Sequence, residues 1–188
     1  FVDELSHYSV LDAASRTGLP VTRFRHAEPD HLDSLLRAEL APGQRPLVMT
    51  DGVFAARGRI APVAAYHDVL ARHEGAVLLV DDAHGLGVLG EHGRGTFERA
   101  GLHHDLNDDD SSRFVCGTLS KAIGGYGGVI PGSQRFIDRL KRTSHWYDGA
   151  SPLPPSVAAA SARGLELVLT EPALRQSLAS NVRLLKTG

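Results

Sequence analysis

The sequence has little of several features that mark particular classes of protein. Cys116 is the one cysteine among 188 residues, so no disulfide can form within the chain, which is typical of a reducing compartment. The longest apolar runs, such as residues 76–80, are far shorter than the ~20 residues that a membrane-spanning helix needs. The formal charge is -2, from 20 lysines and arginines against 22 acids, so no positive excess favours nucleic acid or an anionic membrane. We therefore expect a cytoplasmic protein with no nucleic-acid or membrane partner.

The sequence also lacks an initiator methionine and a basic-then-apolar signal pattern at its start. It opens at Phe1 with what reads as the end of a strand, which is typical of a piece of a longer polypeptide. With 42% hydrophobic residues it has enough apolar side chains for a buried core, and its length suggests one domain or a little more.

Short apolar runs alternate with helical patterns, which predicts an α/β domain with a mostly parallel sheet. Strands are expected at residues 21–24, 47–50, 76–80, 114–117 and 128–130. Helices are expected from Asp30, Pro62 and Ser133, and over residues 156–169, because suitable first residues precede helical apolar spacing.

Two charged segments have simple interpretations. The acids of residues 107–112 could suggest a metal site, but such a run is more often an exposed loop, so no metal is expected. The helix from Ser133 carries Arg135, Arg139 and Arg142 on one side, which predicts a face in contact with solvent.

The first chemical constellation is VLLVDDAHGLG at residues 77–87, where an apolar strand meets two carboxylates and a histidine at a glycine-rich bend. Ligands of open parallel sheets bind beyond the carboxyl ends of strands, which is where Asp81 and His84 lie. A buried carboxylate there needs a cationic partner, and a protonated pyridine nitrogen would be one. The alternative is that Asp81 caps the following turn and His84 is a hydrogen-bonded core residue.

The second constellation is GTLSKAIGGYGG at residues 117–128. The chain has three lysines, and Lys121 is the one outside a polar helical context. An apolar strand before it and glycines after it can desolvate the amine and let it attack a carbonyl as the free base. Thr118 and Ser120 place hydroxyls beside it, and the glycines let backbone approach a ligand closely. The alternative is an ordinary lysine of a surface loop.

The two segments, residues 77–87 and 117–128, indicate a specific chemistry only when they are considered together. Pyridoxal phosphate needs a lysine for an imine, an aspartate for its ring nitrogen, and hydroxyls with loop amides for its phosphate. Asp81, Lys121 and Thr118 supply this chemical set on two successive strand ends. The sequence therefore predicts a pyridoxal 5'-phosphate site.

Over nearly its whole length the chain resembles the α-oxoamine synthases, a family of fold type I pyridoxal-phosphate enzymes. The resemblance rests on DELSHYS at residues 3–9, TDGVF at 50–54, DDAHGLGVLGEHGRGTFE at 81–98 and GTLSKAIGGYGG at 117–128. It implies a seven-stranded-type, mostly parallel sheet with helices on both faces, as the large domain of that fold. That domain would occupy residues 1–170 and be incomplete at its N-terminus, and residues 171–188 would begin the connection to a small carboxyl-terminal domain.

The resemblance implies roles for five residues. Lys121 would hold the cofactor as an imine and later move the α-proton of the substrate. Asp81 would pair with the pyridine nitrogen, and His84 would hydrogen-bond the phenolic oxygen of the cofactor. Thr118 would bind the phosphate. His7 would line the same pocket, and its alternative is a histidine satisfied at a strand end.

Three positions depart from the family pattern. Ala55 stands where a serine is common and Arg57 where an acid is common, so the choice of substrate is left open. Pro152 stands where a serine or threonine is usual, in the segment of residues 150–155 that reaches the phosphate of the neighbouring subunit in the family. The assembly that the resemblance implies is a homodimer with active sites at the interface.

The activity implied by the resemblance is condensation of an amino acid with an acyl-CoA, with decarboxylation, to give an α-oxoamine. An aminotransferase, or another reaction on the same cofactor, is the nearest alternative. Residues 77–84 are also similar to the metal-binding strand of P-loop ATPases, but a GxxxxGK[ST] loop is absent and Lys121 would be left unexplained. A non-catalytic relative is the third alternative, which Lys121 disfavours.

Overall fold

The computed structural model describes residues 1–187, and its centre is a six-stranded sheet in the order β2-β1-β3-β6-β7-β8. Each pair of neighbours from β2 to β7 is parallel, and β8 is antiparallel to β7. The strands are β1 (Val2–Asp3), β2 (Arg23–Phe24), β3 (Leu47–Asp51), β6 (Val77–Asp81), β7 (Arg113–Thr118) and β8 (Gly128–Val129). The predicted α/β class with a mostly parallel sheet is confirmed.

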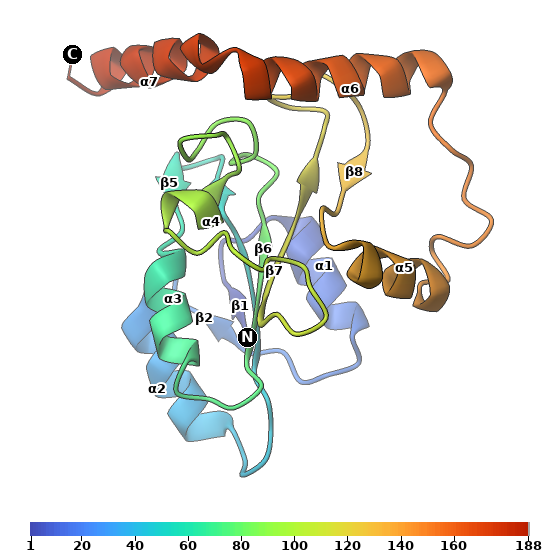
Figure 1. Cartoon of the computed structure of the whole chain (residues 1–188). Coiled ribbons are helices and arrows are strands. Elements are labelled where there is room, and N and C mark those ends of the chain that lie inside the picture. Colours follow the sequence, from blue (N-terminus) through green and yellow to red (C-terminus); the bar gives the residue numbers. More distant parts are fainter. Residues whose placement is uncertain (188) are drawn as a thin grey trace.

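Seven helices occur within residues 1–187, and a small hairpin lies apart from the main sheet (Figure 1). The helices are α1 (Tyr8–Arg16), α2 (Pro29–Glu39), α3 (Val63–Leu70), α4 (Thr96–Arg99), α5 (Gln134–Thr143), α6 (Pro155–Thr170) and α7 (Pro172–Thr187). The hairpin pairs β4 (Val53–Phe54) with β5 (Arg59–Ile60) in antiparallel fashion.

Helices cover both faces of the sheet because successive strand residues point to opposite sides. Val48, Leu78 and Val80 face a core formed with α2 and α3, in which the fully buried Leu36 and Tyr66 take part. Met49, the next residue along β3, packs on the other face in a smaller cluster with α1. The prediction that helices cover both faces of the sheet is therefore confirmed (Figure 1).

The predicted elements agree with the structure to within a few residues. Ser133 caps α5 as expected, because its hydroxyl accepts a hydrogen bond from the backbone N–H of Phe136 at 3.2 Å. Helix α1 was not predicted. Its N-cap is His7, whose ring accepts a hydrogen bond from the backbone N–H of Ser9, and Val10 and Ala14 are its buried residues.

The basic face of α5 is exposed, as predicted, and two of its arginines also bind the acid-rich loop. Arg135 and Arg139 form ion pairs with Asp109 at 2.5 and 2.9 Å. Asn107 is buried in the same loop, where its side chain bonds the backbone of Val115 at both N–H and C=O. These hydrogen bonds hold the loop against β7, so it is not simply an exposed loop. Within residues 1–187 no cluster of three or more potential metal-ligating side chains occurs.

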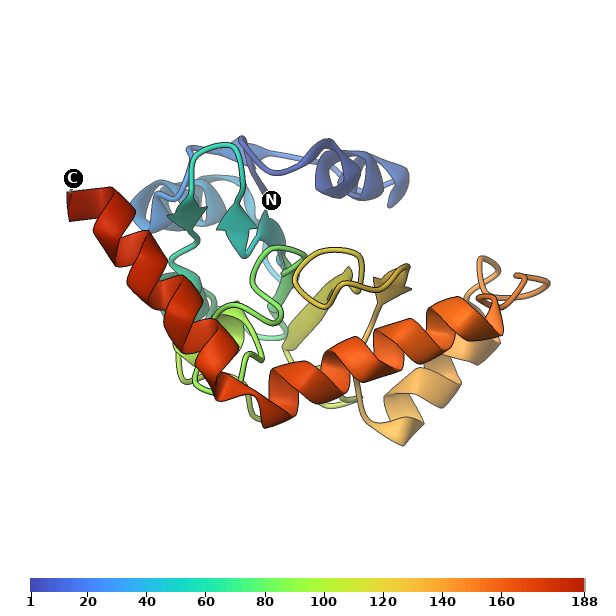
Figure 2. The same cartoon turned by 90° about the horizontal axis from the view of Figure 1, so that it is seen from above.

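Helices α6 and α7 lie across the end of the sheet toward which β7 points, and meet at an angle (Figures 1 and 2). Ser161 of α6 is buried and accepts a hydrogen bond from the backbone N–H of Tyr126 at 3.2 Å, so α6 supports the loop of residues 117–128. In contrast, α7 has no buried residue. The segment predicted to begin the interdomain connection is this helix, and its last residue, Gly188, lies outside the described residues. No helix of residues 1–187 has the length and apolar character to cross a membrane.

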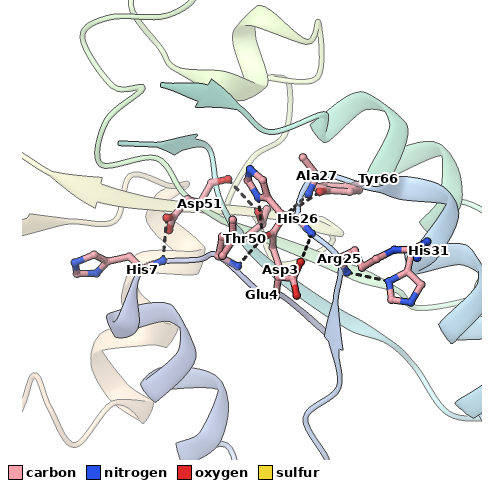
Figure 3. Close-up of polar contacts among 11 residues, drawn as sticks. Asp3, Glu4, His7, Arg25, His26, Ala27, His31, Thr50, Asp51 and Tyr66 are labelled. Carbon is pink, nitrogen blue, oxygen red and sulfur yellow. Dashed lines mark hydrogen bonds and ion pairs between the residues drawn. The ribbon is translucent and has the colours of Figure 1, made fainter. Parts of the chain in front are cut away.

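A buried carboxylate joins the first strand to the turn after β2 and to α3. Asp3 is fully buried and accepts hydrogen bonds from the backbone N–H groups of Leu5 at 2.9 Å and Ala27 at 2.8 Å. It also contacts Nδ1 of His26 at 3.0 Å and accepts a long bond from the Tyr66 hydroxyl at 3.4 Å (Figure 3). Buried carboxylates are tolerated only with such partners, so Asp3 fixes β1, the turn after β2 and α3 relative to one another.

We predict that Asp3→Ala destabilises the protein by about 3 kcal/mol or more, because it leaves buried N–H groups without an acceptor. Urea unfolding, followed by circular dichroism, measures the loss as a lower midpoint. Asp12→Ala, at an exposed position of α1, is the control and should unfold with the parent protein. Equal midpoints for Asp3→Ala and the parent would contradict this role.

Candidate active site

Three polar side chains stand side by side where the central strands end. The parallel register pairs Asp51 of β3 with Asp81 of β6, and Asp81 with Cys116 of β7. The residues that precede Asp51 and Asp81 are apolar or buried, so each strand runs through the core and places its polar end at one edge. This edge is where parallel α/β sheets bind ligands.

A cavity of about 380 Å³ lies at this edge of the sheet. Its volume falls in the range of ~300–1,000 Å³ that is usual for small-molecule sites. Its walls bring together four of the five residues predicted from the sequence, and Thr118 is outside them. The lining residues are Leu5, His7, Asp51, Val53, Phe54, Ala55, Ala56, Arg57, Asp81, Ala83, His84 and Lys121.

Asp81 is positioned by the turn that follows β6. Its Oδ1 accepts a hydrogen bond from the backbone N–H of Ala83 at 3.0 Å. Within residues 1–187 no cation lies within ion-pair distance of this carboxylate, so its charge is left for a ligand in the cavity. Asp81 therefore caps its turn and faces the cavity at the same time.

Lys121 and His84 meet in the same cavity from two different strand ends. Nζ of Lys121 lies 2.8 Å from Nε2 of His84. The pKa of His84 is lowered, first by desolvation and then by the charge of Lys121. A neutral imidazole can accept a hydrogen bond from the lysine amine. Both side chains are nevertheless exposed, so the desolvated lysine expected from the sequence is not found in this single chain.

Thr118 and His7 have local partners. The Thr118 hydroxyl donates to the carbonyl of Gly127 at 3.0 Å and lies 2.6 Å from the Ser120 hydroxyl, so it fixes the loop that carries Lys121. The backbone N–H of His7 donates to Asp51 at 3.0 Å, and its ring caps α1 through Ser9. His7 therefore lines the cavity and is also satisfied at the end of a strand, which combines the two expectations.

A second carboxylate, Asp82, locks the turn behind Asp81. It is fully buried and accepts hydrogen bonds from the N–H and the hydroxyl of Thr96 at 2.6 and 2.5 Å. Burial raises its pKa. A Cβ at Gly85 would collide with its carboxylate, so the glycine after His84 is required for the close approach.

Asp51 is a site residue that the sequence reasoning missed. It follows an apolar strand just as Asp81 does, and that parallel was the available signal. Desolvation raises its pKa to about 6, and the hydrogen bond from the backbone N–H of His7 opposes this shift. Burial likewise raises the pKa of the neighbouring Cys116 thiol to about 12, so this cysteine is not a nucleophile at neutral pH.

The cavity thus offers a lysine amine held by a neutral imidazole, next to a carboxylate without a cationic partner. An amine of this kind can add to a carbonyl, and a carboxylate can stabilise a protonated heterocyclic nitrogen. The apolar side chains of Leu5, Val53 and Phe54 also line the cavity. This arrangement suits covalent chemistry on an aldehyde attached to a charged aromatic ring.

The family described as aminotransferase class I and II matches residues 1–188. An 8-amino-7-oxononanoate synthase of Methylococcus capsulatus is 42% identical over 188 residues, which are 100% of this chain and 46% of that protein. The chain therefore spans about half the length of the curated relatives that it matches.

Two serine palmitoyltransferase structures share the fold. The enzyme of Sphingomonas wittichii has a TM-score of 0.84 at 35% identity, covering 96% of this chain and 43% of that one. The enzyme of S. paucimobilis with bound PLP–myriocin aldimine has a TM-score of 0.84 at 33% identity, covering 97% of this chain and 44% of that one. These similarities confirm the resemblance to α-oxoamine synthases and the partial fold type I domain that it implied.

The raised pKa of Asp51 predicts how stability depends on pH. The folded chain binds this proton more tightly than the unfolded chain, whose pKa is about 4, so stability falls as pH rises from about 4 to about 6. Asp51→Asn keeps an acceptor for His7 and removes this titration. Above pH 6 the free energy of unfolding of Asp51→Asn should therefore exceed that of the parent protein by about 1–3 kcal/mol.

Urea unfolding at several pH values, without added ligand, measures this gain. Asp68→Asn, at an exposed position of α3, is the matched control and should follow the parent protein throughout. A constant difference between Asp51→Asn and the parent from pH 4 to pH 7 would contradict the prediction.

Proposed function

The chain belongs to the aminotransferase class I and II family, and on this premise we propose that it is a pyridoxal-phosphate-dependent acyltransferase of the α-oxoamine synthase kind. It would condense an amino acid with an acyl-CoA, releasing carbon dioxide and free CoA. The observation that carries the proposal is one cavity lined by the Lys121 amine, its hydrogen-bonded partner His84 and the carboxylate of Asp81.

The side chains present fit the functional groups of pyridoxal phosphate. Lys121 offers an amine for the aldehyde, and Asp81 offers an unpaired carboxylate for the ring nitrogen. His84 would hydrogen-bond the phenolic oxygen. Thr118 and Ser120 lie together on the loop before Lys121, and their hydroxyls would bind the phosphate after giving up their present contact with each other. When bound, the cofactor supplies an electron sink for a carbanion at the amino acid's α-carbon.

The protein's own groups would then control protons and water. Lys121 would remove the proton from the α-carbon of the amino acid, with His84 holding Nζ in place at 2.8 Å. Asp81 would keep the ring nitrogen protonated, because a nearby carboxylate favours the charged form of a base. The apolar wall of Leu5, Val53 and Phe54 would limit water beside the reacting carbon.

The assembly and the division into domains are part of the proposal. Lys121 and His84 are exposed in a single chain, whereas such chemistry needs a site that excludes water, so we propose that a second subunit covers the cavity as a homodimer. The exposed segment of residues 150–154 is available to reach across. Residues 1–170 would form the large domain, and the exposed α7 would lead to the small domain. A cytoplasmic location stays a prediction.

An aminotransferase on the same cofactor is the second candidate, and the matching family description favours it. Both reactions need Lys121 and Asp81, so the two candidates are separated by their products. An ATPase is not supported, because the family match includes residues 77–84 and the cavity there contains Lys121.

We predict that Lys121→Ala abolishes the visible absorption band of cofactor bound to a lysine, because no other lysine lines the cavity. Absorption spectroscopy of the purified protein with added pyridoxal phosphate measures this. Lys186→Ala, at an exposed position of α7, is the matched control and should keep the full band. A Lys121→Ala protein with an unchanged band would place the bound aldehyde elsewhere.

We predict that the cofactor-loaded protein releases free CoA thiol from an acyl-CoA only when a suitable amino acid is present. A thiol reagent follows the release across panels of amino acids and acyl-CoA donors, and Lys121→Ala should show none. Transfer of the amino group to a 2-oxo acid without thiol release would favour the aminotransferase. Neither reaction, in a protein that keeps its visible band, would contradict both candidates.

A further inference from the structure

One wall of the cavity comes from the β4–β5 hairpin, because residues 53–57 all line it. The base of the hairpin is bonded to the strand ends. The backbone N–H of Gly52 donates to the carbonyl of Asp81 at 2.8 Å, and that of Ala61 donates to the carbonyl of Gly52 at 2.9 Å. The loop at its other end, residues 55–58, is exposed. The position of this wall therefore depends on what supports the hairpin between its base and its loop.

Phe54 connects the hairpin to the interior of the protein. Its side chain is 3% exposed, and its ring meets the ring of His26 edge-on, with centroids 4.3 Å apart and planes at 86°. His26 lies in the turn after β2, outside the hairpin and outside the strands that carry the polar side chains of the site. Edge-to-face contacts of aromatic rings are directional, so the orientation of the His26 ring determines where the Phe54 ring lies.

The orientation of the His26 ring is set by the buried carboxylate of Asp3. Nδ1 of His26 lies 3.0 Å from Oδ1 of Asp3, and the backbone N–H of Ala27 donates to Oδ2 at 2.8 Å (Figure 3). The second ring nitrogen of His26, Nε2, is buried and has no hydrogen-bond partner within residues 1–187. A phenyl ring would avoid the cost of burying that nitrogen, so what the imidazole adds here is its bond to Asp3.

Asp3 also holds a second residue that lines the cavity. Its Oδ1 accepts a hydrogen bond from the backbone N–H of Leu5 at 2.9 Å, and Leu5 lines the cavity together with Phe54. The same oxygen is the one that bonds the ring of His26. Two apolar lining residues from distant segments are thus positioned from one buried carboxylate on β1, a strand that is itself paired with β2 and β3.

We propose that His26 is a positioning residue of the active site: held by Asp3, its ring fixes Phe54 and thereby the hairpin wall of the cavity. This inference rests on the proposed function. His26 does not itself line the cavity, so it acts through Phe54. In the proposed reaction this wall limits water beside the amino acid held at Lys121, and a displacement of about 1 Å can lower such a rate by about 100-fold.

Hydrogen exchange tests the support of the hairpin without any reaction. His26→Asn keeps a side-chain amide that can donate to Asp3, but it removes the part of the ring that meets Phe54. We expect residues 52–61 of the ligand-free variant to exchange roughly 10-fold faster than in the parent protein, which corresponds to loss of one aromatic pair. Mass spectrometry of peptides measures this, with residues 76–81 of the sheet reporting on global unfolding. Unchanged exchange in residues 52–61 would overturn the proposal.

The control variant is Tyr66→Phe. The Tyr66 hydroxyl donates to Oδ2 of the same carboxylate at 3.4 Å, so this variant disturbs Asp3 but leaves His26 against Phe54. Its hairpin should exchange as in the parent protein. Equal acceleration in His26→Asn and Tyr66→Phe would indicate a general loss of stability and would contradict the positioning role.

His26→Phe is a second variant, which serves if His26→Asn does not fold. It keeps an aromatic ring against Phe54 and loses the bond to Asp3, so the hairpin should exchange faster than in the parent protein and more slowly than in His26→Asn. Exchange as slow as in the parent protein would overturn the role of Asp3 in orienting the ring.

The cofactor-loaded protein tests the consequence for catalysis. His26→Asn should keep the visible absorption band and a KM for the amino acid within about twofold of the parent value, whereas kcat for thiol release should fall roughly 10-fold. Phe54→Leu should lower kcat as well. The double variant should fall no further than Phe54→Leu alone, because His26 acts through Phe54. Additive losses, or a kcat of His26→Asn equal to that of the parent protein, would contradict the proposal.

The two measurements separate failure of this inference from failure of the proposed function. Faster hairpin exchange in His26→Asn, in a protein whose parent performs neither reaction, would support the role of His26 and contradict the proposed function. A parent protein that releases thiol, together with unchanged hairpin exchange in His26→Asn, would overturn the positioning role alone.

Discussion

The parallel register of β3, β6 and β7 is the constraint on which the rest of the structure depends. It sets Asp51, Asp81 and Cys116 side by side at one edge of the sheet. A shift of one residue in β6 would turn Asp81 to the opposite face, because strand side chains alternate. The buried alternation of Val48, Leu78 and Val80 opposes such a shift, since these side chains would leave the core. The hydrophobic core and the chemistry of the site are therefore fixed by one alignment.

The charges of the cavity are arranged so that each group has one role. Lys121 contacts His84 and not Asp81, although all three line the same space. A direct ion pair between Lys121 and Asp81 would satisfy both groups and leave neither for a ligand. The backbone N–H of Ala83 holds Asp81 without neutralising it, and the lowered pKa of His84 keeps the imidazole neutral toward the lysine. The site thus keeps an amine and a carboxylate separately available.

Much of this could be predicted from the sequence, and the failures have physical causes. The apolar runs predicted the central strands, and the motifs around Asp81 and Lys121 predicted which side chains would share a cavity. Asp51 was missed because its partner, the backbone of His7, is 44 residues away. The interaction of Arg135 with Asp109 was missed for the same reason, since a local charge pattern cannot show which loop a helix will meet. Exposure of Lys121 depends on which chain segments cover it, and no local pattern encodes that.

Each wall of the cavity is supported by a buried polar residue that hydrogen-bonds a segment distant in the sequence. Asp82 holds Thr96 and closes the turn after Asp81, while Asp3 holds His26 and, through it, Phe54 of the hairpin. Ser161 anchors the loop that carries Lys121 from the side of α6. Apolar packing alone would fix the sheet but not the loops at its edge, because loops bury few side chains. Hydrogen bonds are directional, and in a buried setting leaving them unmade is costly, so these three residues can hold loop side chains in one geometry. Hydrogen bonds of buried residues therefore hold the site loops in one geometry, whereas apolar packing stabilises the sheet.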